Sequence, residues 1–541
     1  MSTRQVVGGV AAAAALIAGL TILARLAGFA RTLVFTNTVG PDSTGDAYLA
    51  ANNVPNIVFE VVAGGALASL VVPMLAGGIA AADRDQVRRT ASALLGWTLL
   101  VLVPLAALVA LLAEPIARLL LGDSDEAEIQ LAARFLLVFA PQVVLYGIGI
   151  VVTGVLQAHR RFAGPALAPL LSSLVVAGAY LTFAALGGDE QAAELSTPAE
   201  LVLGVGTTLG VAALALSLLV PLRGLRLGLR PTLRFPVGAA PRVRRLAAAG
   251  VLTLAGQQLL AAVAIRLAND GAPDGTQVVY AAGLTVFLLP WAALAVPLAT
   301  SVYPGLAERA GSGDEAGYHR ALAPVTVLTV ALSALAAAAL VAGAGPMARI
   351  FLSGEPAGVV AALRNTIVAF APGLLGYGLV ALLTRALYAR GLWKAPTAWV
   401  LAGWLLAVVA DVLLARALPP ADRALALGIG HTVGVTVAGA GLLAVVLRVA
   451  GRPALRGLAR SGPAALLAAV LGGAAGLWVA RTLGADPVPD GGVAAALAAG
   501  FLAGGTVLVV AVAVMMGTAR AQLVGALREL RSTGEREVRS G

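Results

Sequence analysis

The sequence contains no cysteine and little charge, and each shortage excludes a class of protein. Without cysteine there are no disulfides, thiolate metal ligands or cysteine nucleophiles. Charged residues make up 12% of the 541 residues and hydrophobic residues 59%, whereas soluble proteins carry about 25% charged residues. A water-soluble fold of this composition would expose too much apolar surface, so the chain is expected to be an integral membrane protein.

Histidine and lysine are also scarce, and the motifs of nucleotide and metal chemistry are missing. There are three histidines, and Lys394 is the one lysine. No Walker loop, metal-ligand cluster or Ser/His/Asp arrangement is found, so neither an enzyme nor a cofactor is expected. The preference for arginine, alanine and glycine favours a GC-rich bacterial genome, such as that of an actinobacterium.

Long apolar runs recur from end to end, as expected for helices that each need about 20 residues to cross a bilayer. The first run continues past the usual cleavage distance, so it is interpreted as an uncleaved helix and not as a signal peptide. Fourteen spans are predicted, at 7–36, 46–77, 91–113, 131–157, 164–186, 201–220, 244–268, 275–305, 321–343, 361–390, 395–417, 424–449, 463–485 and 492–516.

The loops alternate between basic and acidic, which predicts the orientation. Because basic loops stay on the cytoplasmic side, both termini are predicted to be cytoplasmic. This alternation also explains the net charge of +10 without a nucleic-acid partner. The arginine-rich stretch 221–245 is interpreted as a topogenic connector that touches anionic headgroups, in preference to a specific ligand site. The basic loops contain Arg84, Arg88 and Arg89, then Arg160 and Arg161, then seven arginines in 221–245, then Arg452, Arg456 and Arg460.

The chain repeats itself at one constant offset, the spacing from Phe139 to Phe370, and this is the most specific structural signal. Nine identities fall between 139 and 165, and matches at the same offset extend over four predicted helices. The nine include Pro141 with Pro372, Tyr146 with Tyr377, Thr153 with Thr384 and Leu156 with Leu387, and matches outside this window include Pro115 with Pro346 and Pro73 with Pro304. A duplication of six-span units explains the constant offset.

An even number of spans in each unit makes the two lobes parallel, as in secondary transporters. The predicted fold is therefore an all-α polytopic membrane protein with two parallel six-helix lobes and two C-terminal helices. The expected boundaries are 1–231 for the N-lobe, 232–460 for the C-lobe, 461–516 for helices 13 and 14, and 517–541 for a cytoplasmic tail.

Ionisable residues inside the spans are candidates for function, because each costs about 2.5–3.5 kcal/mol to insert. Arg25 and Arg31 lie in span 1, about 9 Å apart along the axis, and either could instead extend to an interface. Arginine is suited to binding phosphate, since it is forked and permanently charged. Span 2 carries Asp46 and several asparagines, among them Asn53, around Pro55.

Asp411 lies near the middle of span 11, where a charge is hardest to expose. Two interpretations remain open for it. It could be a cation or proton site, or it could pair structurally with Arg416 or His431.

The segment Ala24–Arg31, the run Gly45-Asp46-Ala47-Tyr48 and the run Asn53-Val54-Pro55-Asn56 resemble the first two helices of the MurJ/MviN family of the MOP flippase superfamily. The stretch from Val279 to Pro304 is similar to the family's eighth helix. The resemblance implies a flippase of the bacterial cytoplasmic membrane that moves lipid II, or a similar polyprenyl-pyrophosphate lipid, from the inner to the outer leaflet by alternating access. It further implies Na⁺ or H⁺ coupling or drive by the membrane potential, and cell-wall synthesis proteins as partners.

The resemblance also supplies roles for residues. It implies that Arg25, Arg31, Asp46, Asn53 and Arg266 bind the substrate. Asp411 resembles one acidic ligand of a cation site. Phe59 and Glu60 stand where many members carry basic residues, so the cavity is expected to be less cationic here.

Other functions are weighed against the lipid II flippase. A MATE-type drug exporter or a polysaccharide-lipid flippase would share two lobes, and a major facilitator would share parallel six-helix halves. A membrane enzyme or scaffold is disfavoured by the repeat and by the missing catalytic cluster.

Overall fold

The computed structural model describes the chain except for residues 1–2, 62–70, 189–190, 235–239, 487–491 and 519–541, and it describes side chains outside 3–18, 73 and 240–253. Throughout these described residues the regular structure is helical, with no strand. Helices suit an apolar chain because they pair nearly all their backbone N–H and C=O groups internally, as lipid requires. The prediction of an all-α membrane protein is confirmed.

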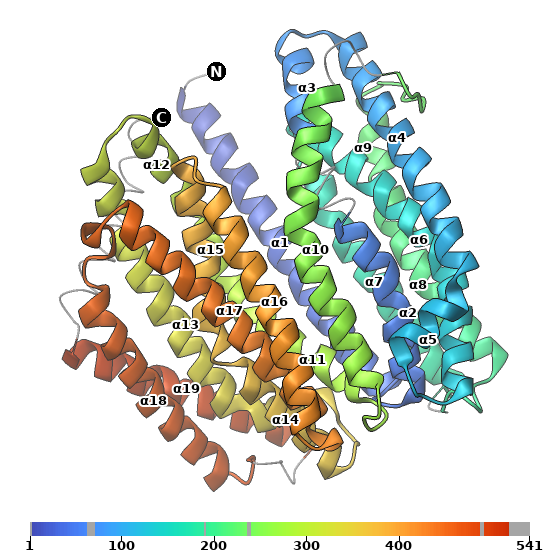
Figure 1. The fold of residues 1–541 in the computed structure, drawn as a ribbon, viewed down its shortest axis with the longest axis vertical. Coiled ribbons are helices and arrows are strands. Elements are labelled where there is room, and N and C mark those ends of the chain that lie inside the picture. The colour runs from blue at the N-terminus through green and yellow to red at the C-terminus, as the bar shows by residue number, and fades with distance from the viewer. Residues whose placement is uncertain (1–2, 62–70, 189–190, 235–239, 487–491, 519–541) are drawn as a thin grey trace. The chain divides into compact units, whose positions relative to one another are not determined.

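The chain divides into two compact units, Met1–Val278 and Val279–Gly541. Helices of the first unit run from blue to green in Figure 1. They are α1 (Thr3–Thr38), α2 (Ser43–Phe59), α3 (Val71–Ala80), α4 (Arg84–Leu111), α5 (Ala113–Leu121), α6 (Glu126–Ala158), α7 (Ala163–Ala185), α8 (Thr197–Ser217), α9 (Leu219–Arg223) and α10 (Ala240–Asn269).

The second unit begins within α11 (Thr276–Pro290), which a π-helical turn, η2 (Trp291–Ala295), joins to α12 (Val296–Gly311). Two short 3₁₀ turns, Pro420–Asp422 and Arg452–Leu455, lie in its loops. The other helices are α13 (Glu315–Phe351), α14 (Ala357–Phe370), α15 (Gly373–Ala389), α16 (Lys394–Ala417), α17 (Arg423–Val449), α18 (Leu458–Thr482) and α19 (Val493–Thr518).

The division between the units falls later than the lobe boundary predicted from the sequence, which ended the N-lobe at Pro231. The reason is that α10 packs against α2 and α5, which belong to the first unit. The predicted boundary describes the repeat in sequence, whereas the observed division describes packing.

Among the residues that the structure describes, eleven helices are long and apolar enough to cross a membrane, or twelve when the bent pair α14 and α15 counts as one span. Each of them falls on one of the fourteen predicted spans. The two predicted spans without a match are 46–77, which includes the undescribed residues 62–70, and 244–268, where side chains are described only from 254. The number fourteen therefore stays a prediction.

The helix boundaries recur at the offset found in the sequence. That offset links the start of α4 at Arg84 to the start of α13 at Glu315, and the start of α6 at Glu126 to that of α14 at Ala357. The end of α6 at Ala158 likewise matches the end of α15 at Ala389. The duplication thus repeats whole helices.

The repeat extends to an uncommon local conformation. A π-helical turn begins at Glu60 in the first unit, and another begins at Trp291, the equivalent position of the repeat. Next to these turns, the rings of Phe59 and Tyr146 lie 4.6 Å apart, and the rings of Trp291 and Tyr377 lie 4.4 Å apart. π-turns inside α-helices frequently mark functional sites.

The two units differ at one proline pair. Pro141 lies inside the continuous helix α6, whereas its counterpart Pro372 lies at a break where α14 and α15 meet at 44°. Proline removes one backbone hydrogen bond and its ring crowds the preceding turn, so a kink is expected at either position.

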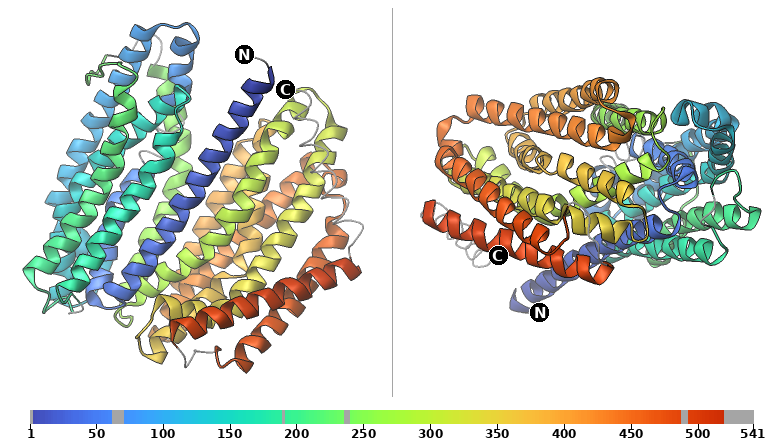
Figure 2. Two further views of the ribbon diagram at one scale, coloured as in Figure 1. Left: turned by 180° about the vertical axis from the view of Figure 1, so that it is seen from behind. Right: turned by 90° about the horizontal axis from the view of Figure 1, so that it is seen from below.

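The last two helices, α18 and α19, lie outside the repeated part of the sequence. α18 and α19 pack against each other and against α13 (Figure 2). Glycines make the contact close, because a Cβ at Gly472 or Gly476 would lie within 3 Å of the backbone of α19. Small residues at such interfaces are typical of helices that associate in lipid.

Candidate functional site

Arg31 lies in the first unit beside a group of tyrosines. Its guanidinium acts electrostatically on the hydroxyls of Tyr48, Tyr146 and Tyr180, and its side chain is partly buried. Phe35 is one helical turn further along α1, on the same face, and its ring lies 5.3 Å from Tyr48 and 5.2 Å from Tyr180. Arg31 thus lies on the same face of α1 as Phe35 and within electrostatic range of the tyrosine hydroxyls.

The tyrosine group is rigid because its hydroxyls are bonded to one another. The Tyr48 hydroxyl lies 2.8 Å from the Tyr180 hydroxyl and 2.8 Å from the Thr207 hydroxyl. Thr207 in turn donates to the Leu203 carbonyl at 2.7 Å. These bonds join α2, α7 and α8, so the positions of the tyrosine hydroxyls near Arg31 are fixed.

Arg25 has a different environment from Arg31. Their spacing along α1 places them about 120° apart around the helix. Arg25 is exposed among apolar neighbours, with Ile22 61% and Leu26 51% exposed. Within the described part of the chain, no carboxylate forms an ion pair with Arg25 or Arg31. Two cationic side chains of α1 therefore remain unneutralised by described groups.

Asp46 is buried, and its carboxylate accepts hydrogen bonds from backbone N–H groups. Its side chain accepts the N–H of Gly275 at 2.7 Å and the N–H of Val278 at 3.0 Å, which fixes the start of α11 to α2. Gly275 has φ +81°, and a Cβ there would meet the backbone of Pro41, so glycine is required at this contact. Both Asp46 oxygens are occupied, a geometry that favours a structural role over the predicted substrate contact.

We expect Asp46→Ala to destabilise the protein, because it leaves two buried N–H groups without acceptors. Each such group costs about 1–3 kcal/mol. The thermal unfolding midpoint of the purified protein in detergent should fall for Asp46→Ala and fall less for Asp46→Asn, which keeps one acceptor. An Asp46→Ala protein as stable as the wild type would rule out this anchoring role.

Asn53 and Arg266 also have local partners. The Asn53 amide donates to the Leu49 carbonyl at 2.7 Å, along its own helix. Arg266 pairs with Asp270 one turn later at 2.7 Å. Its guanidinium lies on Gly122, where a Cβ would collide with it. Arg266 is therefore neutralised and fixed, in contrast to Arg31.

Asp411 is the most unusual group of the second unit. It is 0% exposed, and neither carboxylate oxygen has a hydrogen-bond partner among the described residues. Gly430 on α17 lies directly against it, since a Cβ there would overlap a carboxylate oxygen. Neither of the predicted ion pairs, to Arg416 or to His431, forms in the described structure. A buried carboxylate without a partner is costly unless a cation or a proton neutralises it.

His431 lies near the same helix contact, inside a ring of aromatic side chains. Its ring lies 5.3 Å from Phe370, 5.4 Å from Phe287 and 5.7 Å from Trp404. Neither ring nitrogen has a partner among the described residues, and the side chain is buried. The structure thus places His431 among aromatic side chains.

One feature of the sequence could have shown that Asp411 has an equivalent position in the first unit. Tyr180 and Asp411 are equivalent positions of the repeat, separated by the same offset as Phe139 and Phe370. The same place therefore carries a hydrogen-bonded tyrosine in the first unit and an unpartnered carboxylate in the second. The duplicated lobes have diverged in chemistry at one equivalent site.

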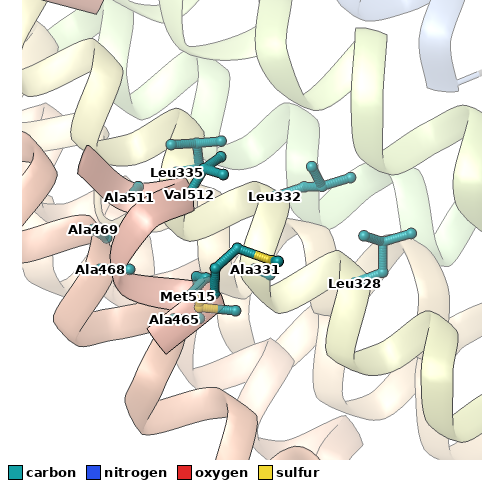
Figure 3. Close-up of a pocket in the computed structure, with 11 residues that line it drawn as sticks. Leu328, Ala331, Leu332, Leu335, Ala465, Ala468, Ala469, Ala511, Val512 and Met515 are labelled. Atoms are coloured by element: carbon teal, nitrogen blue, oxygen red, sulfur yellow. The ribbon is translucent and has the colours of Figure 1, made fainter. Parts of the chain in front are cut away.

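An apolar pocket of about 240 Å³ lies between α13, α18 and α19 (Figure 3). Every lining side chain is alanine, leucine, valine or methionine, including Leu332, Leu335, Ala468, Val512 and Met515. Such a lining can hold a hydrocarbon chain and offers no group to bind a polar ligand.

The sequence and the fold were compared with known proteins. The profile of the family described as lipid II flippase MurJ matches residues 35–483. The chain is 26% identical over 431 residues to a lipid II flippase MurJ of Burkholderia cenocepacia, covering 76% of this chain and 80% of that one. It is 27% identical over 349 residues to a probable lipid II flippase MurJ of Rhizobium meliloti, covering 62% of each.

Solved structures give the same fold. A lipid II flippase MurJ in an inward closed conformation matches with a TM-score of 0.73 at 18% identity, over 93% of this chain and 99% of that one. An inward-facing MATE multidrug transporter matches with a TM-score of 0.63 at 16% identity, over 80% of this chain and 98% of that one. With the family profile spanning most of its length, the chain belongs to the lipid II flippase MurJ family.

Proposed function

We propose that this protein moves lipid II from the inner to the outer leaflet of the bacterial cytoplasmic membrane by alternating access. The observation that carries the proposal is Arg31 on α1, which forms no ion pair with a described residue and lies within electrostatic range of the hydroxyls of Tyr48 and Tyr180. The guanidinium of arginine is forked and permanently charged, and a pyrophosphate offers it two anionic groups to bind. Arg25 supplies a second cation on the same helix.

The tail of such a lipid needs an apolar path, because its isoprenoid chain stays in hydrocarbon. The pocket between α13, α18 and α19 supports this assignment, since its lining has no polar side chain. Within the second unit, this pocket is thus proposed to accommodate a hydrocarbon chain.

The energy source is proposed to be a cation gradient or the membrane potential. The sequence lacks a Walker loop, and one charge crossing a potential of 100 mV releases about 2.3 kcal/mol. Asp411 is the proposed cation site because it is buried with no described partner. No step of this cycle requires covalent chemistry, so the protein is proposed to act without catalysis.

The experiment that tests the proposed function is depletion of the protein in its own host. Lipid II should accumulate in the inner leaflet, and the fraction accessible from outside should fall, before growth stops. Unchanged exposure of lipid II after full depletion, in cells that lack a related flippase, would refute the proposal. A MATE-type exporter shares the fold, and its loss would change drug sensitivity and leave lipid II unchanged.

The orientation is proposed from the basic loops, with both termini in the cytoplasm. Reporters fused after Gly187 and after Gly228 should then report opposite sides, because one predicted span separates them. Reporters on the same side would overturn the topology and, with it, the assignment of each arginine to a leaflet.

A further inference from the structure

The connector that follows α9 is packed onto α4 and is not a loose loop. The N–H of Thr232 donates to the Ser92 carbonyl at 3.1 Å, and the N–H of Arg230 donates to the Ser92 hydroxyl at 3.2 Å. The Trp97 indole donates to the Leu233 carbonyl at 3.0 Å. Gly96 permits this contact, because a Cβ there would collide with the Thr232 carbonyl oxygen.

An open groove of about 390 Å³ lies between this connector and α4. From Gly96 to Pro104 it follows α4 for about 12 Å, at the helical rise of about 1.5 Å per residue. It is lined by Leu99, Leu100, Val103 and Pro104 of α4 and by Pro231 and Leu233 of the connector. Since α4 is a candidate membrane span, the groove has the length and the lining for a segment of an acyl chain.

Basic residues flank, in sequence, the part of the connector that lines the groove. Arg230 and Arg234 flank the connector residues that line it, and both are exposed. Trp97, 42% exposed, marks the interfacial level that tryptophan prefers. The connector and the start of α4 together contain seven arginines and two aspartates. The aspartates are Asp83 and Asp85, and the arginines are Arg84, Arg88, Arg89, Arg223, Arg226, Arg230 and Arg234.

The two acidic groups have other partners. Asp85 pairs with Arg88 at 3.0 Å, and Asp83 caps α4 by accepting the N–H of Gln86 at 2.8 Å. Neither Arg230 nor Arg234 forms an ion pair with a described residue. The exposed, basic connector and the apolar groove that it lines are therefore together complementary to an anion that has a hydrocarbon tail.

We propose that this groove is a binding site for an anionic phospholipid, with the phosphate held by Arg230 and Arg234 and one acyl chain lying along α4. The arginine-rich stretch then has a specific ligand site in addition to its role in topology. This lipid is distinct from the transported substrate, and its site consists of residues that the proposed function does not use.

A phosphatidylglycerol with a photoreactive acyl chain tests the proposal on the full-length protein in detergent. In the wild type, it should label peptides that contain residues 96–104. Phosphatidylcholine with the same acyl chain should label them at least tenfold less. The double variant Arg230→Gln/Arg234→Gln should bind phosphatidylglycerol about 30-fold more weakly, because each arginine near an anionic surface contributes about fivefold.

Two further variants distinguish lipid binding at this site from a general effect of positive charge. Arg452→Gln/Arg456→Gln removes the same charge from another basic loop and should leave the labelling unchanged. Gly96→Val keeps every charge but displaces the connector, so labelling of 96–104 should be lost while the protein still elutes as a single species. Equal labelling by phosphatidylcholine, or an equal loss in the Arg452→Gln/Arg456→Gln protein, would overturn the site. Unchanged labelling in the Arg230→Gln/Arg234→Gln protein would overturn it as well.

Discussion

Replacing Arg31 by alanine is expected to abolish lipid II translocation while the protein still inserts and folds. Arg31 lies within electrostatic range of Tyr48, Tyr146 and Tyr180 and has no described carboxylate partner, so its charge is available to an anionic substrate. Truncating one partner of a desolvated charge pair typically costs about 2–5 kcal/mol, so activity should fall at least about 30-fold. Translocation in cells and reconstituted vesicles, with expression measured in parallel, provides the readout.

The conservative variant separates charge from geometry. Arg31→Lys keeps the charge but loses the forked donors that match a phosphate, so we expect partial rescue. Arg25→Ala should also abolish translocation if both cations hold the pyrophosphate. Because Arg25 is exposed, we expect Arg25→Lys to reduce translocation less than Arg31→Lys does.

Arg266 is the matched comparison within the same unit. Its pairing with Asp270 and its contact with Gly122 leave little of its charge for a ligand. Arg266→Gln is therefore expected to reduce translocation much less than Arg31→Ala. If the double variant Arg25→Ala/Arg31→Ala supports growth and normal translocation in a strain without a related flippase, these arginines are structural and the proposed substrate site is wrong.

Hydropathy and the repeat predicted most of the fold. Apolar runs identify spans because insertion depends on composition over about 20 residues, which is a local property. The constant offset of the repeat predicted that α4 and α13, and α6 and the pair α14 and α15, begin at matching positions, as they do. Breaks were harder to predict, because Pro141 and Pro372 are equivalent in sequence and only the second coincides with a bend between two helices.

The site could be predicted less well, because a side chain's role depends on partners far away in sequence. Nothing near Asp46 indicates that its carboxylate accepts the N–H groups of Gly275 and Val278, which follow only after eight further helices, α3 to α10. By contrast, the four-residue spacing of Arg266 and Asp270 at the end of α10 is a local pattern from which their ion pair could have been predicted. The environment of Arg31 depends on helices α2, α6 and α7, which no local pattern in α1 specifies.

The unpartnered carboxylate of Asp411 leads to the second large expected effect, on cation coupling. If a cation neutralises this group, then adding that cation should raise the unfolding midpoint of the protein. A hundredfold excess over the dissociation constant stabilises a folded state by about 2.7 kcal/mol. Asp411→Asn removes the charge that the cation needs, so its midpoint should not respond to Na⁺, and its translocation should no longer depend on a cation gradient.

The same variant should be more stable than the wild type when no cation is bound. The wild type then holds a carboxylate that is 0% exposed and has no described partner, whereas the amide of Asn is neutral and less costly to bury. Glu308→Gln, which removes a carboxylate from another helix of the same unit, is the control and should keep the wild-type response to cations. Unfolding midpoints should therefore be measured over a range of Na⁺ concentrations and of pH, for the wild type and both variants. A wild type whose midpoint responds to neither Na⁺ nor protons, or an Asp411→Asn protein that responds as the wild type does, would show that Asp411 is not the coupling site.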